Sequence, residues 1–180
     1  MGVFIALVRA IGPATHARMS MQALRDGCEA AGLKRVTTFI ATGNVIFESR
    51  RSAAAVQAIV EGVLRSFGLT NDVVLRKPDE LAAVIAADPF PDAAAARPSA
   101  LAVCFLAATP DGNALAQLLR HPGPERVAHI GRDVCIDYAA GIAGSKLMPG
   151  VVERRLGVVA TARNWNTARK LLALARALDG

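Results

Sequence analysis

The segment from Val3 to Val8 is continuously apolar and rich in branched side chains. Such a run is typical of a β-strand that is buried on both of its faces. A strand of this kind cannot lie at the surface, so other segments must cover each face. We therefore expect a layered fold in which a sheet and helices share a core.

The residues after this strand predict a helix followed by a β-hairpin. Met19 to Ala31 places apolar side chains on one face at helical spacing. Two short β-prone runs follow, Val36 to Ile40 and Val45 to Phe47, separated by Ala41-Thr42-Gly43-Asn44. A Gly-Asn centre between such runs is typical of a tight hairpin turn.

A second helix and a fourth strand complete the first half of the chain. Ser52 introduces an alanine-rich helical segment that ends at Gly68, and Val73 to Arg76 is again β-prone. The resulting order, βαββαβ, is that of ferredoxin-like folds, in which helices cover one face of an antiparallel sheet.

The second half repeats this order of elements with little residue identity to the first. Pro78 to Ala87 predicts a connecting helix, and Phe90 to Ser99 predicts a loop. The elements predicted after it are a strand at Leu101–Leu106, a helix at Gly112–Arg120, strands at Arg126–Ile130 and Val134–Tyr138, a helix at Met148–Leu156, a strand at Val158–Ala160 and a C-terminal helix. We predict an α/β protein of the α+β type, with ferredoxin-like subdomains at 1–77 and 78–180 packed as one compact unit.

The composition is that of a soluble intracellular protein. Hydrophobic residues make up 53% of the 180 residues, and no apolar run approaches the roughly 18 residues that cross a bilayer. Arg9 interrupts the first apolar run before a signal-peptide core is complete. The three cysteines are odd in number and widely spaced, which indicates reduced thiols. We expect a cytoplasmic protein with no membrane partner, and the sequence leaves its oligomeric state open.

The formal net charge of +6 raises the question of nucleic-acid binding, because clustered basic residues neutralise phosphates. The first half carries nearly all of the excess, yet no run of basic residues exceeds a pair. Aromatic residues make up 4% of the chain, too few for a platform on which bases stack. Solvated arginines explain the charge equally well, so nucleic acid is an alternative partner that is not favoured.

Several stretches of the chain together form a distinctive pattern. They are Ile5 to Ile11 with Met21 to Arg25, Phe39 to Phe47, Asp88-Pro89-Phe90, and Thr161 to Thr167. In this order, and over nearly the whole chain, they resemble the bacterial family known as domain of unknown function 1697, or DUF1697.

The resemblance implies paired ferredoxin-like subdomains, in agreement with the predicted element order, and it implies no activity. This sequence departs from the family in the first loop, where Gly12 to His16 replaces an asparagine and paired glycines. The departure weakens any phosphate-cradling role for that loop. Thr42-Gly43-Asn44 and Asp88-Pro89-Phe90 replace Ser-Gly-Asn and Asn-Pro-Phe, and both changes conserve shape.

The end of the chain offers the first group of candidate ligand-binding residues. Arg163, Asn164 and Thr167 lie where a strand passes into a helix, and the free amides of a helix start attract anions. The alternative is structural, with Asn164 as the helix cap, Trp165 in the core and Arg163 paired with an acid.

The first half offers the second group. Arg9 ends a strand suited to complete burial, so it needs solvent, an internal acid or an anionic ligand. We predict that Arg9, Asn164 and the amides of the last helix lie close together and bind an anion. Thr42 and Asn44 present polar groups at a sheet edge, although a Gly-Asn turn needs no further function.

Catalytic and cofactor chemistry finds little support in the sequence. Cys28, Cys104 and Cys135 fall in apolar or acidic surroundings, where a thiol is not activated. The histidines lack metal-ligand spacing, and the standard dinucleotide and P-loop signatures are missing, so we expect no metal and no cofactor. Gly141 to Lys146 only superficially resembles a phosphate loop, and we interpret it as a plain loop.

Three classes of function stay open on these grounds, and no catalytic residue is identified. The favoured one is a small binding or regulatory module for an anionic ligand. The alternatives are single-stranded nucleic-acid binding and an enzyme that uses no metal. For the enzyme, the sequence offers only Arg9, His16, Lys146 and Arg163 as scattered candidates.

Overall fold

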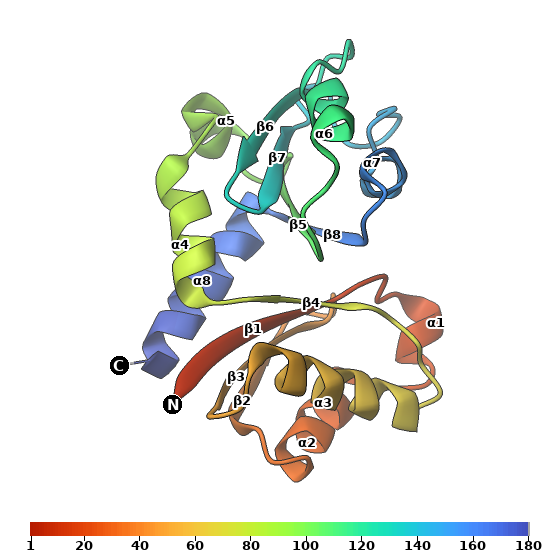
Figure 1. Cartoon of the computed structure of the whole chain (residues 1–180), viewed down its shortest axis with the longest axis vertical. Coiled ribbons are helices and arrows are strands. Elements are labelled where there is room, and N and C mark those ends of the chain that lie inside the picture. The colour runs from red at the N-terminus through yellow and green to blue at the C-terminus, as the bar shows by residue number, and fades with distance from the viewer. Residues whose placement is uncertain (180) are drawn as a thin grey trace. The chain divides into compact units, whose positions relative to one another are not determined.

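The computed structural model describes residues 1–179 and divides into two compact units. The first unit holds Met1–Asp79 with the residues from Leu171 onward, and the second holds Glu80–Lys170. Each unit is built on one four-stranded antiparallel sheet (Figure 1), so the expected α/β class is confirmed. The predicted segments are 1–77 and 78–180, whereas the structure groups the end of the chain with the first unit.

The first sheet has the strand order β2-β3-β1-β4, and all of its strand pairs are antiparallel. Helices α2 and α3 pack together on one face of this sheet (Figure 1). In chain order the elements are β1 (Gly2–Val8), α1 (Pro13–His16), α2 (Met21–Ala30), β2 (Lys34–Phe39), β3 (Asn44–Ser49), α3 (Ala53–Ser66) and β4 (Val73–Arg76).

The strand β1 is buried on both faces, as its composition predicts. Every residue from Val3 to Val8 is buried. Phe4, Ala6 and Val8 belong to the core that α2 and α3 close, and the side chains that alternate with them are buried as well. Burial of such a strand removes a large apolar area from water, at roughly 25 cal/mol per Å².

Two serines fix the starts of the helices in this unit. The Ser20 hydroxyl accepts a hydrogen bond from the Ala23 N–H at 3.0 Å, and the Ser52 hydroxyl accepts one from the Ala55 N–H at 3.3 Å. Each bond satisfies an amide that the helix itself leaves without a partner. Gly68, at a φ of 71°, follows the end of α3 as the sequence predicts.

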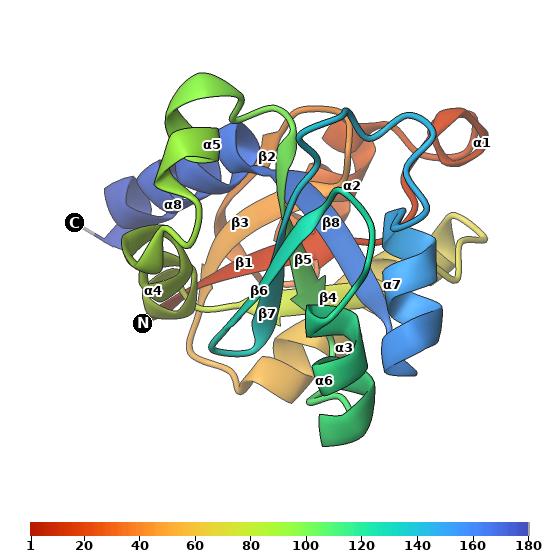
Figure 2. The ribbon, with the colours of Figure 1, turned by 90° about the horizontal axis from the view of Figure 1, so that it is seen from above.

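The second sheet has the strand order β6-β7-β5-β8, which matches the first sheet strand for strand. Helices α6 and α7 lie side by side and contact its outer strands β6 and β8 (Figure 2). The elements from Pro78 onward are α4 (Pro78–Ala87), α5 (Pro91–Ala96), β5 (Leu101–Leu106), α6 (Gly112–Leu119), β6 (Arg126–Ile130), β7 (Asp133–Asp137), α7 (Pro149–Leu156), β8 (Ala160–Asn164) and α8 (Trp165–Asp179).

The central strand β7 divides its side chains between the two faces of the second sheet. Val134 and Ile136 belong to the apolar core beside α6 and α7. Because successive side chains of a strand alternate, Asp133, Cys135 and Asp137 lie on the opposite face. All five residues are buried, so this face carries two carboxyl groups inside the protein.

Three local predictions are wrong. Gly12 to His16 and Phe90 to Ser99 were expected as loops but contain the short helices α1 and α5. Both helices begin at a proline, whose fixed φ suits the first helical position. The last strand spans Ala160–Asn164 instead of Val158–Ala160, because pairing with β5 continues as far as Asn164.

Among residues 1–179, no helix is both long enough and apolar enough to cross a bilayer.

Candidate functional site

Thr42 and Asn44 use their polar groups within the turn of the first hairpin. Asn44 is buried, and its Nδ2 donates to the carbonyl of Phe39 and to the Thr42 hydroxyl, both at 3.0 Å. The carbonyl of Gly43 accepts the Val8 N–H at 2.8 Å. These contacts support the turn interpretation, and a ligand role for Thr42 and Asn44 stays a prediction.

Arg9 lies just beyond β1 and is partly exposed. Its Nη1 is 3.9 Å from Oδ2 of Asp72, and the Arg9 side chain is 36% exposed. Its backbone carbonyl accepts a hydrogen bond from Asn71 at 2.8 Å. His16, in α1, places Nε2 2.8 Å from the carbonyl of Ala41, so this nitrogen donates to the backbone.

The junction of β8 and α8 carries the other predicted residues. Oδ1 of Asn164 accepts the Thr167 N–H at 2.9 Å, which is the arrangement of a helix cap. Nη1 of Arg163 donates to the Thr161 hydroxyl and to the carbonyl of Ala162, both at 2.8 Å. Burial lowers the pKa of Arg163 to about 10. These contacts support structural roles for Asn164 and Arg163.

The predicted anion site would join residues of different units. Arg9 belongs to the first unit, whereas Arg163, Asn164 and Thr167 belong to the second. Their convergence therefore stays a prediction, and each residue is described by its contacts within its own unit.

The three cysteines pack inside the protein. Cys28, Cys104 and Cys135 are all buried and free of disulfides. Burial raises the pKa of each thiol to about 12, and nearby Asp133 contributes to the shift of Cys104 and Cys135. The thiols are protonated at neutral pH, which agrees with the expected packing role.

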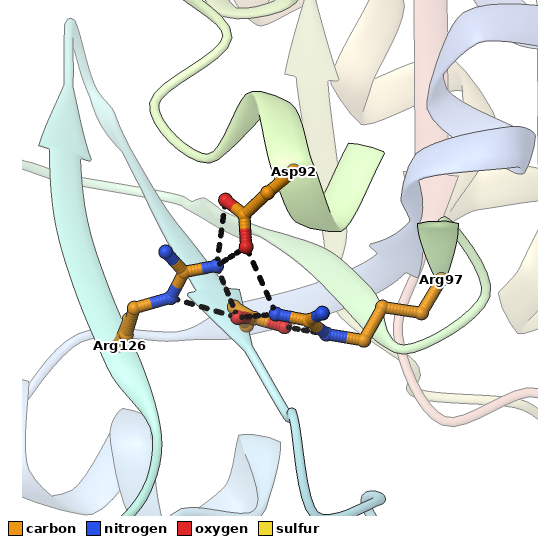
Figure 3. Close-up of polar contacts among 4 residues, drawn as sticks. Asp92, Arg97 and Arg126 are labelled. Carbon is orange, nitrogen blue, oxygen red and sulfur yellow. Dashed lines mark hydrogen bonds and ion pairs between the residues drawn. The ribbon is translucent and has the colours of Figure 1, made fainter. Parts of the chain in front are cut away.

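Four charged side chains that the sequence analysis did not select meet near the end of β7 (Figure 3). Asp137 ends β7, and Arg126 is its cross-strand partner on β6. Asp92 lies in the first turn of α5, and Arg97 directly follows that helix. We call these residues, Asp92, Arg97, Arg126 and Asp137, the arginine–aspartate cluster.

The buried Asp137 orients both guanidinium groups of the cluster. Arg97 donates to it through Nε at 3.0 Å and Nη2 at 2.6 Å. Arg126 donates through Nε at 2.9 Å and Nη2 at 2.7 Å. Burial raises the pKa of Asp137, but the hydrogen bonds from Arg97 and Arg126 outweigh this effect and hold the pKa below its usual value. Asp137 is therefore ionised at neutral pH.

Asp92 occupies the outer side of the same two arginines. Its side chain is 60% exposed, and Nη2 of Arg126 donates to both of its oxygens, at 2.9 and 2.7 Å. Nη2 of Arg97 lies 3.4 Å from one of them. The hydrogen bond from Arg126 lowers the pKa of Asp92. Within the described residues, Nη1 of neither arginine makes a hydrogen bond (Figure 3).

An aromatic ring also supports Arg126. The guanidinium carbon of Arg126 lies 4.7 Å from the ring centroid of Phe90, a cation–π distance. Phe90 ends the Asp88-Pro89-Phe90 stretch and directly precedes α5. This stretch therefore positions the helix that carries Asp92 and the ring that supports Arg126.

The two guanidinium groups of the cluster have a chemistry suited to anions. Guanidinium groups stay protonated at all physiological pH values and present planar forks that match carboxylates and phosphates. They are poor proton donors, so these two arginines are better suited to binding than to general acid catalysis.

A signal for half of this cluster is present in the sequence. Asp137 directly follows the apolar run Val134 to Ile136 of a predicted strand, and an acid that is buried there requires a partner. Arg126 begins the neighbouring strand of the predicted hairpin, so cross-strand pairing could have joined the two. Asp92 and Arg97 were missed because their helix was expected as a loop.

Comparison with known proteins places the chain among relatives without an assigned activity. The family model of DUF1697, described as a protein of unknown function, matches residues 1–135. The solved structure of conserved bacterial protein SP0830 from Streptococcus pneumoniae is similar with a TM-score of 0.76 and 18% sequence identity, covering 98% of this chain and 99% of that chain. At this identity the likeness shows a shared fold.

No curated protein matches the sequence. The family match covers most of the chain and includes Asp92, Arg97 and Arg126 of the cluster. The chain belongs to the DUF1697 family of proteins of unknown function.

Proposed function

We propose that this protein is a cytoplasmic binding module for a small ligand with a phosphate or carboxylate group, held by Arg97 and Arg126. The observation that carries the proposal is the pair of guanidinium groups oriented by one buried carboxylate. Arg97 and Arg126 are 32% and 42% exposed, so a ligand can reach them from solvent. In this arrangement Asp92 stands where the anionic group of the ligand would bind.

The charges of the cluster favour such an exchange. With Asp92 in place, two guanidinium groups face two carboxylates and the net charge is zero. When Asp92 moves away, two positive charges and the negative charge of Asp137 leave +1 at the site. An incoming anion then restores neutrality and gains charge-assisted hydrogen bonds from guanidinium groups that are already oriented.

The position of Asp92 makes its departure inexpensive. Its side chain is 60% exposed, so water can replace the hydrogen bonds that Asp92 loses when it leaves the arginines. The ion pair therefore contributes little to stability. Asp137 is fully buried and stays. The two aspartates therefore differ in role, because Asp137 orients the arginines and Asp92 competes with the ligand.

The alternatives lack an observation of this kind. The exposed large hydrophobic side chains among residues 1–179 include no aromatic ring, so stacking with the bases of a single-stranded nucleic acid finds no platform. For a metal-independent enzyme, His16 and Arg163 hydrogen-bond to neighbouring backbone or hydroxyl groups. Both alternatives are thus weaker than anion binding.

The experiment is thermal unfolding of the full chain in phosphate, citrate or chloride at one ionic strength. We expect phosphate or citrate to raise Tm above its value in chloride. Asp92→Asn should enlarge this rise, because it removes the competing charge, and Arg126→Gln should abolish it. Asp79→Asn and Arg154→Gln change exposed charges elsewhere and serve as matched controls.

Two results would count against the proposal. One is an equal response to phosphate in Asp92→Asn, Arg126→Gln and the unaltered chain, which would indicate a general salt effect. The other is a response that survives Arg126→Gln but disappears in Arg9→Ala and Arg163→Ala. That result would move the site to the residues that the sequence predicts.

A further inference from the structure

The second unit also contains a cavity of about 410 Å³ that lies between two connecting segments. Residues 121–125, between α6 and β6, form one wall, and residues 140–146, after β7, form most of the other. The volume falls within the range of small-molecule sites, roughly 300–1,000 Å³. The cavity uses no residue of the arginine–aspartate cluster.

The wall formed by residues 140–146 is anchored at its end. The hydroxyl of the buried Tyr138 donates to the carbonyl of Leu147 at 2.7 Å, and Leu147 is itself fully buried. The Leu147 N–H donates to the Ser145 hydroxyl at 2.9 Å. Gly141 and Gly144 adopt φ angles of 86° and 83°, which glycine adopts without strain. The wall is therefore a built surface.

Glu125 accepts one hydrogen bond from the opposite wall and one from its own wall. The Ser145 hydroxyl donates to Oε1, and Nε2 of His121 lies 3.0 Å from Oε2. The side chains of His121 and Glu125 are only 5% and 4% exposed. A Cβ atom at Gly123 would collide with both of them, so the glycine allows the two side chains to meet.

Two side chains hold the ring of His121 in place. Nη1 of Arg155 lies 3.0 Å from Nδ1 of His121. Because arginine only donates hydrogen bonds, Nδ1 is the acceptor in this contact, and Nε2 faces Glu125. His121 therefore orients the carboxylate of Glu125.

Glu125 is the negative charge of the cavity. The hydrogen bond from Ser145 lowers its pKa below the usual value, with a smaller contribution from His121. The Ser145 hydroxyl, Nε2 of His121 and the backbone N–H of Glu125 itself donate to this carboxylate, and a carboxylate can accept about four hydrogen bonds. Glu125 therefore has acceptor capacity left for a ligand that carries N–H donors.

Lys146 supplies a positive charge to the same cavity. It lines the cavity and is exposed, and its ammonium group has no carboxylate partner within residues 1–179. The rest of the lining is largely small and apolar, with Pro122, Pro124 and Ala143. A ligand that matches this lining carries an ammonium group, a small apolar body and a carboxylate.

We propose that this cavity binds a small zwitterion of the amino-acid class, with its ammonium group at Glu125 and its carboxylate at Lys146. The site is separate from the proposed anion site, so either can fail without the other. Binding in this cavity requires both charges of the ligand, so probes that lack one charge test the proposal directly.

The test compares three probes that share one carbon skeleton. L-leucine carries both charges, isopentylamine carries only the ammonium group, and isocaproate carries only the carboxylate. Binding to the full chain is followed by NMR titration of the backbone amides. We expect L-leucine to bind in the millimolar range or tighter, with shifts in residues 121–125 and 140–146. Each of the other two probes should bind at least about tenfold more weakly.

Two variants assign the charges. Lys146→Met leaves the bonds of Glu125 intact and should reduce L-leucine binding to the level of isopentylamine. Glu125→Gln should reduce it to the level of isocaproate, and its amide spectrum shows whether the walls keep their structure. Lys170→Met removes an exposed lysine outside the cavity and should leave Kd unchanged. The proposal is overturned if L-leucine does not bind, binds no better than either half, or binds equally to Lys146→Met.

Discussion

The central strands β3 and β7 hold the same place in their sheets, but the two sheets fix these strands by different means. β3 begins at a tight turn in which Gly43 lies against β1, and its buried Asn44 bonds within that turn. β7 begins and ends with the buried carboxylates of Asp133 and Asp137. Oδ1 of Asp133 accepts the Leu106 N–H at 3.1 Å.

This difference shows that the same strand topology can be held together by two kinds of interaction. In the first unit, the close approach of the Gly43 backbone to β1 determines how the hairpin packs against that strand. In the second unit, buried charges must find hydrogen-bond donors, because an unpaired buried carboxylate is costly. The second sheet consequently collects arginines at its end, and the anion site that we propose would arise from this structural requirement.

Replacement of Gly43 should have the largest effect on stability. Gly43 has a φ of 78°, and a Cβ there would lie 2.6 Å from Cγ1 of Ile11 and 2.9 Å from Cβ of Val8. We expect Gly43→Ala to reduce the free energy of unfolding by about 2–4 kcal/mol, from left-handed strain together with overpacking. Gly131, in the corresponding turn of the second hairpin, has a φ of 60° with open space around it. Gly131→Ala should cost only about 1 kcal/mol.

Urea unfolding measures this contrast. Trp165 is the single tryptophan and lies in the second unit, so its fluorescence follows that unit, while far-UV circular dichroism follows both. Gly43→Ala should shift the circular dichroism transition more than Gly131→Ala does. Equal shifts would show that close approach does not specify the first hairpin.

Asp137→Asn should produce the next largest effect, and this effect should depend on pH. The arginines hold the pKa of Asp137 below its usual value, so its carboxylate stabilises the folded state at neutral pH. This stabilisation is present above the unfolded pKa of about 3.8 and is lost as pH falls through the lower folded pKa. At neutral pH we expect a cost of about 1–3 kcal/mol, from the lost charge-assisted hydrogen bonds.

Unfolding measured by Trp165 fluorescence checks this expectation. The measurement runs from neutral pH to pH values below the pKa of the free carboxyl group. The unaltered chain should lose more stability on acidification than Asp137→Asn, so the two curves converge at low pH. Glu48→Gln removes a carboxylate from β3 and is the matched control, because the only ion pair that Glu48 makes within residues 1–179 is with the half-exposed Arg35. Parallel curves for Asp137→Asn and the unaltered chain would contradict the role assigned to Asp137.

The sequence predicts the elements better than the site, and particular residues show why. Local signals are sufficient for β1, for Ser52 at the start of a helix, and for the Thr42-Gly43-Asn44 turn, because each depends on residues close in the chain. The strand β8 was misplaced because its length depends on pairing with β5, which is distant in sequence.

The arginine–aspartate cluster depends on tertiary contacts in the same way. Arg97 and Asp137 are forty residues apart, and only the register of β6 on β7 and the course of α5 bring them together. A sequence pattern can indicate that Asp137 needs a partner, but it does not identify Arg97. The same limit applies to the contact of Glu125 with Ser145, which lies in the Gly141–Lys146 segment that the sequence predicts to be a plain loop.

Helix caps should show the smallest difference between the units. Oδ1 of Asp111 accepts two N–H groups at the start of α6, from Asn113 at 2.9 Å and Ala114 at 3.0 Å, whereas the Ser20 hydroxyl accepts one at the start of α2. The Asp111 carboxylate also opposes the positive end of the helix dipole. We expect Asp111→Ala to cost about 1–1.5 kcal/mol and Ser20→Ala about 0.5–1 kcal/mol.

Urea titration by far-UV circular dichroism resolves this ranking when Asp111→Asn is included. Asparagine keeps a cap oxygen but removes the charge, so Asp111→Asn should recover most of the loss and leave a few tenths of a kcal/mol that added salt reduces. If Asp111→Asn is as destabilised as Asp111→Ala, the charge rather than the hydrogen bonds carries the cap. A larger cost for Ser20→Ala than for Asp111→Ala would contradict this ranking. Helix packing, rather than the charge of the cap residue, would then decide how much each cap contributes to stability.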